Sequence, residues 1–169
     1  TAAVSDILAA VRERGDEAVV EYTRRFDGVE GPLTCVERES LGELAAACEP
    51  RLMEALRRAA ANIEDFHRRQ VQQSWLTARE DGTILGQRIR GLERVGLYVP
   101  GGTAAYPSSV LMNAIPARIA GCREIVMVTP PSRDGSIAPA ILAAARVAGV
   151  DRVFKIGGAQ AVAALAYGT

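Results

Sequence analysis

Three short segments of this 169-residue chain combine residue types that suit an anionic ligand. Each follows a predicted strand and breaks the regular backbone with prolines or paired glycines: Val99-Pro100-Gly101-Gly102, Thr129-Pro130-Pro131 and Ile156-Gly157-Gly158. Proline removes a backbone donor and fixes φ, whereas glycine accepts backbone angles closed to other residues. Where such a corner opens a helix, exposed N–H groups and the positive end of the helix dipole suit a phosphate or pyrophosphate. The corners therefore predict a nucleotide-binding edge.

Two side chains beside these corners could contact the nucleotide. Tyr98 precedes the first corner and could lay its ring and hydroxyl against the ligand, and Gln160 stands just inside the helix after the third corner. The glycines have a second interpretation, in which they only allow strands and helices to pack closely. Gly157-Gly158 lacks the third glycine of a G-x-G-x-x-G fingerprint, so spacing leaves both interpretations open.

Residues typical of catalysis and metal binding are scarce. His67 is the only histidine, and a single histidine within a predicted helix is interpreted as structural. Ser108-Ser109 has no base near it in sequence and is interpreted as a helix N-cap. Three widely spaced cysteines without a C-x-x-C pair are interpreted as small buried side chains in a reducing compartment, which favours the cytoplasm: Cys35, Cys48 and Cys122. We expect no catalytic residue and no metal ligand in this chain.

Hydrophobic periodicity places the three corners on one sheet. The pattern predicts alternating strands and helices: Val95–Val99, Ser108–Ala120, Glu124–Thr129, Ser136–Ala148, Arg152–Ile156 and Ala159–Tyr167. Strands joined by such helices imply right-handed crossovers and a parallel sheet, whose carboxyl ends share one edge. Pro116 lies inside the first of these helices and predicts a kink or an early end.

The first 90 residues have the pattern of charged helices. Two helices are predicted up to Gly15 and Gly28, followed by an extended piece over 33–36. Ser40 is predicted to cap a helix that carries Glu43, and a longer helix is predicted from Pro50 to about Gln70. Asp81-Gly82 predicts a hairpin turn between Leu76–Arg79 and Ile84–Ile89.

Charge is balanced overall but unevenly distributed. The chain has 20 basic and 20 acidic residues, and 29 of these 40 lie within residues 1–90. We therefore predict a boundary near Gly91 between a charged helical region (1–90) and an α/β region (91–169). A net charge of zero gives no field to attract nucleic acid, and no apolar run reaches the length of a membrane span, so we expect neither partner.

Long blocks of this sequence resemble the histidinol dehydrogenase family. They are VGLYVPGGTAAYPSSVLMNAIPARIAG, EIVMVTPP followed by DGS, and IGGAQAVAALAYGT, with RERGDEAVVEYTRRFDG and NIEDFH in the first half. The resemblance implies a homodimeric zinc enzyme that oxidises L-histidinol through L-histidinaldehyde to L-histidine and passes two hydrides to NAD. It also implies an incomplete Rossmann-like module, related in shape to aldehyde dehydrogenases. By matching motif, Tyr98 and Gln160 correspond to NAD-contacting residues.

The resemblance also implies what this chain lacks. Family members are much longer, and beyond the position of Thr169 they carry a GPGN segment of the NAD site, the zinc ligands and a Glu-His pair for acid–base chemistry. We therefore expect an N-terminal fragment that supplies part of the NAD platform and is inactive by itself. The alternative is a stand-alone, non-catalytic module for nucleotide binding or dimerisation. As a fragment, the chain would expose an apolar face of its last helix and, unless the Ile84–Ile89 segment covers it, strand 95–99 as a sheet edge. It would then self-associate or use a partner chain to cover these surfaces.

Overall fold

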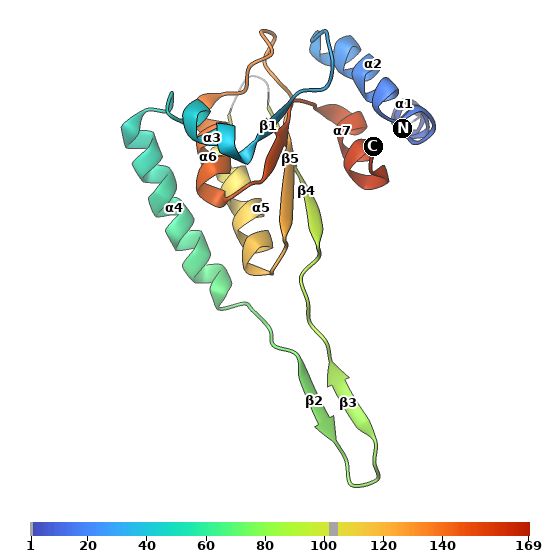
Figure 1. The fold of residues 1–169 in the computed structure, drawn as a ribbon, viewed down its shortest axis with the longest axis vertical. Coiled ribbons are helices and arrows are strands. Elements are labelled where there is room, and N and C mark those ends of the chain that lie inside the picture. The colour runs from blue at the N-terminus through green and yellow to red at the C-terminus, as the bar shows by residue number, and fades with distance from the viewer. Residues whose placement is uncertain (1, 102–104) are drawn as a thin grey trace.

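The computed structural model describes residues 2–101 and 105–169, which form an α/β body from which a long hairpin projects (Figure 1). Its elements, in chain order, are α1 (Ala2–Arg14), α2 (Asp16–Asp27), β1 (Cys35–Glu37), α3 (Arg38–Ala45), α4 (Pro50–Arg68), β2 (Trp75–Ala78), β3 (Ile84–Gln87), β4 (Arg94–Tyr98), α5 (Pro107–Ile119), β5 (Glu124–Val128), α6 (Pro139–Ala148), β6 (Arg152–Phe154) and α7 (Gly158–Tyr167).

The main sheet confirms the predicted parallel strands and adds one more. Its four strands lie in the order β1-β6-β5-β4, and β4, β5 and β6 are parallel. The extended piece predicted near 33–36 becomes β1, which pairs antiparallel with β6 from Cys35–Phe154 to Glu37–Arg152. Among the described residues β4 lies at the other edge, as expected, because β2 and β3 pair with each other in a separate two-stranded sheet.

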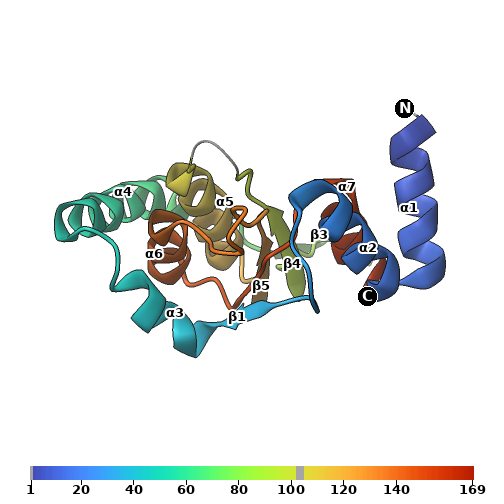
Figure 2. The same ribbon diagram turned by 90° about the horizontal axis from the view of Figure 1, so that it is seen from above.

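Helices cover both faces of the sheet. The direction in which the chain moves across the sheet reverses when α7 returns to β4. One core cluster packs residues of α3, α4, α5 and α6 against Ile125 and Met127 of β5. The other packs α1, α2 and α7 against Val128, so α7 lies on the face opposite α5 and α6 (Figure 2). α7 returns across the sheet to β4, where Gly96 leaves room for Leu165; a Cβ at Gly96 would lie 2.7 Å from Leu165 Cδ1. Such a reversal is the topological switch point of an open α/β sheet.

Partly buried ion pairs hold the amino ends of the strands. The Asp151 carboxylate accepts from the Ile125 N–H at 2.8 Å and pairs with Arg118 at 2.9 Å and Arg38 at 2.8 Å. Burial raises the pKa of Asp151, but these three donors lower it by more, so the pKa lies below its ordinary value of 3.8. Asp151 therefore connects α3, α5 and β5.

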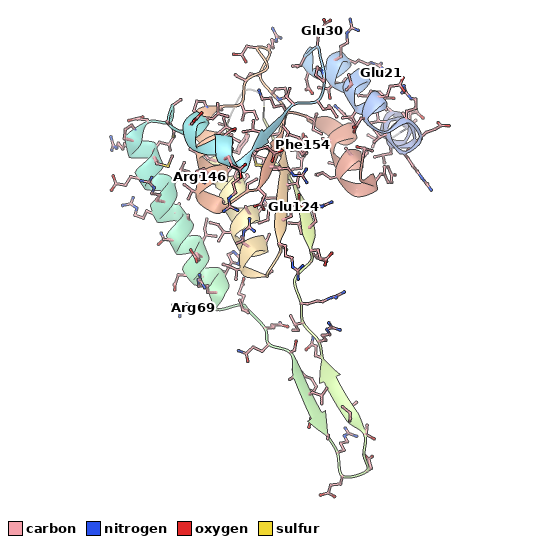
Figure 3. The ribbon with its side chains drawn as sticks, in the orientation of Figure 1. Glu21, Glu30, Arg69, Glu124, Arg146 and Phe154 are labelled. Atoms are coloured by element: carbon pink, nitrogen blue, oxygen red, sulfur yellow. The ribbon has the colours of Figure 1, made fainter. Side chains whose placement is uncertain are left out.

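A second carboxylate acts across three strands. Glu124 of β5 pairs with Arg152 of β6 and with Arg94 of β4, the latter at 2.5 Å (Figure 3). Hydrogen bonds from Arg152 and Arg94 lower the pKa of Glu124. The pair of contacts aligns the amino ends of β4, β5 and β6.

Four local predictions need correction. Ser40 is not an N-cap, because the chain runs from β1 directly into α3, which begins at Arg38 and has no side-chain cap. Ser108 and Ser109 are not N-caps either: α5 begins at Pro107 after Tyr106. Pro116 does not end α5 early, because the helix continues to Ile119. α6 begins at Pro139, because Ser132–Ser136 forms a turn in which Asp134 accepts from the Ser136 N–H at 3.0 Å.

The elements on either side of the predicted boundary at Gly91 share one core. Val36, Leu41 and Leu56 from the first 90 residues belong to the same buried cluster as Ile125 and Val153. The division into two regions at that point stays a prediction drawn from composition. Within the described residues, no helix is long and apolar enough to span a membrane.

Candidate functional site

The three corners meet at one point above the carboxyl ends of the strands. Pro130, after β5, lies between the corner after β4 and the corner after β6. A Cβ placed on Gly157 would lie 2.5 Å from Pro130 Cβ, and one placed on Gly101 would lie 2.7 Å from the Pro130 carbonyl oxygen. The close-packing interpretation therefore holds for Gly101 and Gly157, whose missing side chains let the corners converge. Gly102, the second glycine of the first corner, lies outside the described residues.

Tyr98 connects the first corner to the third. It ends β4, lies on the α7 side of the sheet together with Gly96, and is 40% exposed. The N–H of Gly158, the first residue of α7, donates to the Tyr98 hydroxyl oxygen at 3.3 Å. Gly158 has a φ of 67°, a left-handed conformation that disfavours other residues. The Tyr98 ring therefore lies at the start of α7 and is partly exposed to solvent.

Gln160 stands in the first turn of α7, two residues after the Gly158 that contacts Tyr98. It is the third residue of α7 and is 1% exposed, yet neither its Oε1 nor its Nε2 has a hydrogen-bond partner among the described residues. A Cβ on Gly158 would lie 2.6 Å from Gln160 Oε1, so this glycine provides the space that the amide occupies. A buried amide without a partner costs about 1–3 kcal/mol. Such a group at a helix N-terminus is suited to a ligand that both donates and accepts hydrogen bonds.

The helix terminus adds a partial positive charge to this site. α7 follows Gly157, which offers no side-chain cap, and its first turn contains no acidic residue. The aligned peptide dipoles therefore favour a negative group near Gly158. Together, the exposed tyrosine ring, the amide without a partner among the described residues and the positive end of the α7 dipole suit an aromatic ring system that carries phosphate groups.

The other sequence candidates lie elsewhere. His67 is on α4, where its Nδ1 lies 2.6 Å from Gln70 Oε1, and it lines a hollow of about 590 Å³ between α4, α5 and the segment before β4. Cys48 and Cys122 are buried, as expected, whereas Cys35 is only half-buried because it lies on the edge strand β1; all three are free thiols. Burial and the Glu37 carboxylate raise the pKa of Cys35 to about 11. Within residues 2–101 and 105–169, no cluster of His, Cys, Asp or Glu could hold a metal ion.

Two contributions to the site were not predicted from the sequence. Pro130 was recognised as a strand breaker, but its place between the glycines of the other two corners follows only from the strand order. The hydrogen bond from Gly158 joins residues 60 positions apart. The sequence signals that pointed towards these contacts were the motif VPGG, which follows β4, and the glycine pair at the start of α7.

Comparison with known proteins identifies the family. The family model described as histidinol dehydrogenase matches residues 1–169. The chain belongs to the histidinol dehydrogenase family. The histidinol dehydrogenase of Moorella thermoacetica is 58% identical over 170 residues, and that of Geobacillus kaustophilus is 56% identical over 167 residues; each alignment covers 99% of this chain.

A solved histidinol dehydrogenase has the same fold. The crystal structure of the Elizabethkingia anophelis protein superposes with a TM-score of 0.89 at 35% identity and covers 98% of this chain. This chain spans only 38% of that protein, and about 40% of the curated relatives. The resemblance and the α/β fold expected from the sequence are thereby confirmed.

Proposed function

We propose that this chain is the N-terminal part of a histidinol dehydrogenase and that it supplies one side of the site for NAD. The whole-length match to the family carries the proposal, since the relatives named histidinol dehydrogenase align with 99% of the chain. Such an enzyme oxidises L-histidinol through L-histidinaldehyde to L-histidine, and the bound NAD accepts the hydrides.

Tyr98 and Gln160 are the residues that would hold NAD. The Gln160 amide, buried without a partner among the described residues, supports this assignment because a bound nucleotide would satisfy it. Tyr98 would place its exposed ring against the cofactor while its hydroxyl stays fixed by the Gly158 N–H. The positive end of the α7 dipole would face the pyrophosphate.

The zinc site and the acid–base groups would come from outside these 169 residues. Family members use zinc to hold the substrate, and the described part of this chain contains no cluster that could bind the ion. Proton transfer to and from the substrate needs a base within hydrogen-bond reach, and the family resemblance gives that role to a Glu-His pair beyond the position of Thr169. We therefore propose that the isolated chain is inactive.

We also propose that the protein is cytoplasmic and works as pairs of copies. Within the described part of the chain β4 is an edge strand that pairs on one side only, and Val162 and Tyr167 of α7 are each 48% exposed. Free strand edges and exposed apolar side chains favour association.

An activity assay tests the proposal. The purified 169-residue chain, incubated with zinc, NAD and L-histidinol, should produce no NADH, and the longer enzyme of which it is proposed to be part should produce NADH under the same conditions. Zinc-dependent NADH formation by the 169 residues would contradict the assignment of the reacting groups to a part outside this chain. A longer protein inactive towards L-histidinol would contradict the proposed substrate.

A further inference from the structure

Three helices border a hollow on the face of the sheet opposite α7. α3, α4 and α6 all pack on this face (Figure 2), and the hollow between them has a volume of about 870 Å³. Each helix contributes one arginine to its wall: Arg38 from α3, Arg57 from α4 and Arg146 from α6. Among the described residues, no Asp or Glu lines it. A concave site of this size is large enough for a small molecule, and its guanidinium groups suit an anion.

Positive charge exceeds negative charge at this hollow. Within the described part of the chain, neither Arg57 nor Arg146 (Figure 3) forms an ion pair or a side-chain hydrogen bond. Arg38 donates from Nη1 to the Asp151 carboxylate at 2.8 Å. Asp151 also accepts from Arg118 at 2.9 Å, so its single charge is already shared between two guanidinium groups. Two arginines at the hollow therefore have no acidic partner among the described residues.

Helix dipoles change this balance only in part. α4 begins at the hollow with Pro50, and it has neither a side-chain cap nor an acidic residue in its first turn. Its positive end favours an anion. The carboxyl ends of α3 at Ala45 and of α6 at Gly149 also border the hollow. Each of these ends contributes about half a negative charge, which is less than the full charge of one arginine.

Small residues keep the hollow open. On the α3 wall, Arg38, Gly42 and Ala45 share one helix face through their i, i+4 and i+7 spacing. Gly42 lies inside α3 without a positive φ, and a Cβ at this position would meet nothing within 4 Å. A glycine inside a helix lowers stability relative to alanine, and here neither backbone conformation nor close packing requires it. The missing side chain leaves room in the hollow for a ligand.

We propose that this hollow binds a small compound that carries two or more phosphate groups. A guanidinium group can pair with phosphate oxygens through two parallel hydrogen bonds, and three such groups from three helices suit a ligand with several negative charges. The chain has no net charge, so no wider positive field favours a long polyanion such as a nucleic acid.

The hollow is separate from the site proposed for NAD. Arg38 contacts Asp151, which precedes β6, and Asp151 accepts from the N–H of Ile125 near the start of β5. The hollow therefore lies towards the amino ends of these strands, whereas the three corners follow the carboxyl ends. A ligand in the hollow would not occupy the place of NAD, and this inference does not depend on the proposed function.

Titration calorimetry with inorganic pyrophosphate tests the site. The 169-residue chain should bind one pyrophosphate, and binding should weaken as salt is added. Arg57→Gln and Arg146→Gln should each raise the dissociation constant about fivefold or more, because each removes a charged donor. Arg58→Gln removes the same charge one residue along α4, from a position that does not line the hollow, and should change the constant by less than about twofold. Absence of saturable binding, or equal effects of Arg57→Gln and Arg58→Gln, would overturn the proposal.

A substitution that fills the hollow gives an independent test. Gly42→Leu places a side chain in the open space beside α3 and should weaken pyrophosphate binding about tenfold or more. Ser40→Leu is the control, since Ser40 is exposed on the same helix and does not line the hollow, and it should change the constant by less than about twofold. Circular dichroism of both variants establishes that the helices are intact.

Two further outcomes would overturn the proposal. Pyrophosphate binding that is unchanged by Gly42→Leu would place the anion elsewhere, for example at the start of α7, and would leave the proposed NAD site untouched. Tighter binding of a polyuridylate RNA that depends on Arg57 and Arg146 in the same way would assign the hollow to a nucleic acid instead of a small compound.

Discussion

The backbone N–H of Gly158 donates a hydrogen bond to the Tyr98 hydroxyl at 3.3 Å and thereby joins the end of β4 to the start of α7. Between these two residues the chain completes two β–α units and crosses to the opposite face of the sheet. The contact therefore closes the switch point at which open α/β sheets bind ligands. Gln160, buried two residues further along α7, contributes an amide whose hydrogen-bonding groups have no partner among the described residues.

Gly157→Ala should destabilise the fold. Its Cβ would lie 2.5 Å from Pro130 Cβ and 3.2 Å from Pro130 Cα, so the corners after β5 and β6 must separate. We expect a loss of about 1–3 kcal/mol in the free energy of unfolding, measured by urea denaturation. Gly42→Ala in α3 is the control, since a Cβ at that position would meet nothing within 4 Å, and it should stabilise by about 0.5–1 kcal/mol. A stable Gly157→Ala protein would show that the corners are not packed as described.

Gln160→Leu should stabilise the protein in the absence of ligand. Leucine has a similar volume and removes an amide that is buried without a partner among the described residues, so the free energy of unfolding should rise by about 1–3 kcal/mol. The same change at exposed Gln87 should have little effect. The gain would be accompanied by a loss of NAD affinity in the longer enzyme. A destabilised Gln160→Leu protein would mean that the amide already has partners.

Asp151→Asn should lower the free energy of unfolding at neutral pH. It should also make that free energy depend less on pH in the acid range. The pKa of Asp151 is lowered in the folded state, so its charge contributes stability above the ordinary value of 3.8. That contribution is lost as the pH falls through the lower, folded-state pKa. Denaturation curves from pH 7 to pH 2 should therefore show the two proteins converging below about pH 4.

The control for this prediction is Asp65→Asn. Asp65 pairs with Arg69 on the surface of α4, and both side chains are more than two-thirds exposed. An exposed pair of this kind contributes at most about 0.5 kcal/mol. If the free energy of unfolding of the Asp151→Asn protein changes with pH in the same way as that of the unmodified protein, Asp151 does not hold α3, α5 and β5 together in the way its contacts indicate.

Cys35 should react slowly with iodoacetamide at pH 8. Burial and the hydrogen bond to Glu37 raise the pKa of its thiol to about 11, compared with an ordinary 9.0. Because the thiolate is the reacting form, the rate at pH 8 should be about a hundredfold below that of an ordinary thiol. Glu37→Gln should accelerate the reaction by removing the carboxylate that opposes ionisation. Rapid alkylation of Cys35 at pH 8, followed by mass spectrometry, would contradict the raised pKa.

The sequence was sufficient for the regular part of the fold and for the convergence of the three corners. Long strand and helix patterns from Val95 onward, together with the rule that parallel strands share a carboxyl edge, were enough to bring together the corners beside Tyr98 and Gln160. They succeed because these elements depend on local periodicity. Spacing could not assign a role to the glycines, since close packing and ligand approach require the same residue type.

Contacts between distant parts of the chain could not be predicted in this way. β1 has only three residues and exists as a strand because it pairs with β6, more than 110 positions away. Ser40 carried a capping signal that was overridden because β1 leads straight into α3. Arg38 and Asp151 are 113 positions apart, and no spacing rule connects them.

Titration of NAD into the longer enzyme, with Tyr98→Ala compared against the unmodified protein, tests the proposed cofactor site most directly. Loss of the ring contact and of the fixed hydroxyl should weaken binding by about 1–3 kcal/mol, or roughly fivefold to more than a hundredfold in the dissociation constant. Circular dichroism of both proteins establishes that the fold is intact. An unchanged NAD affinity in a folded Tyr98→Ala enzyme would contradict the proposal that the corners after β4 and β6 form the cofactor platform.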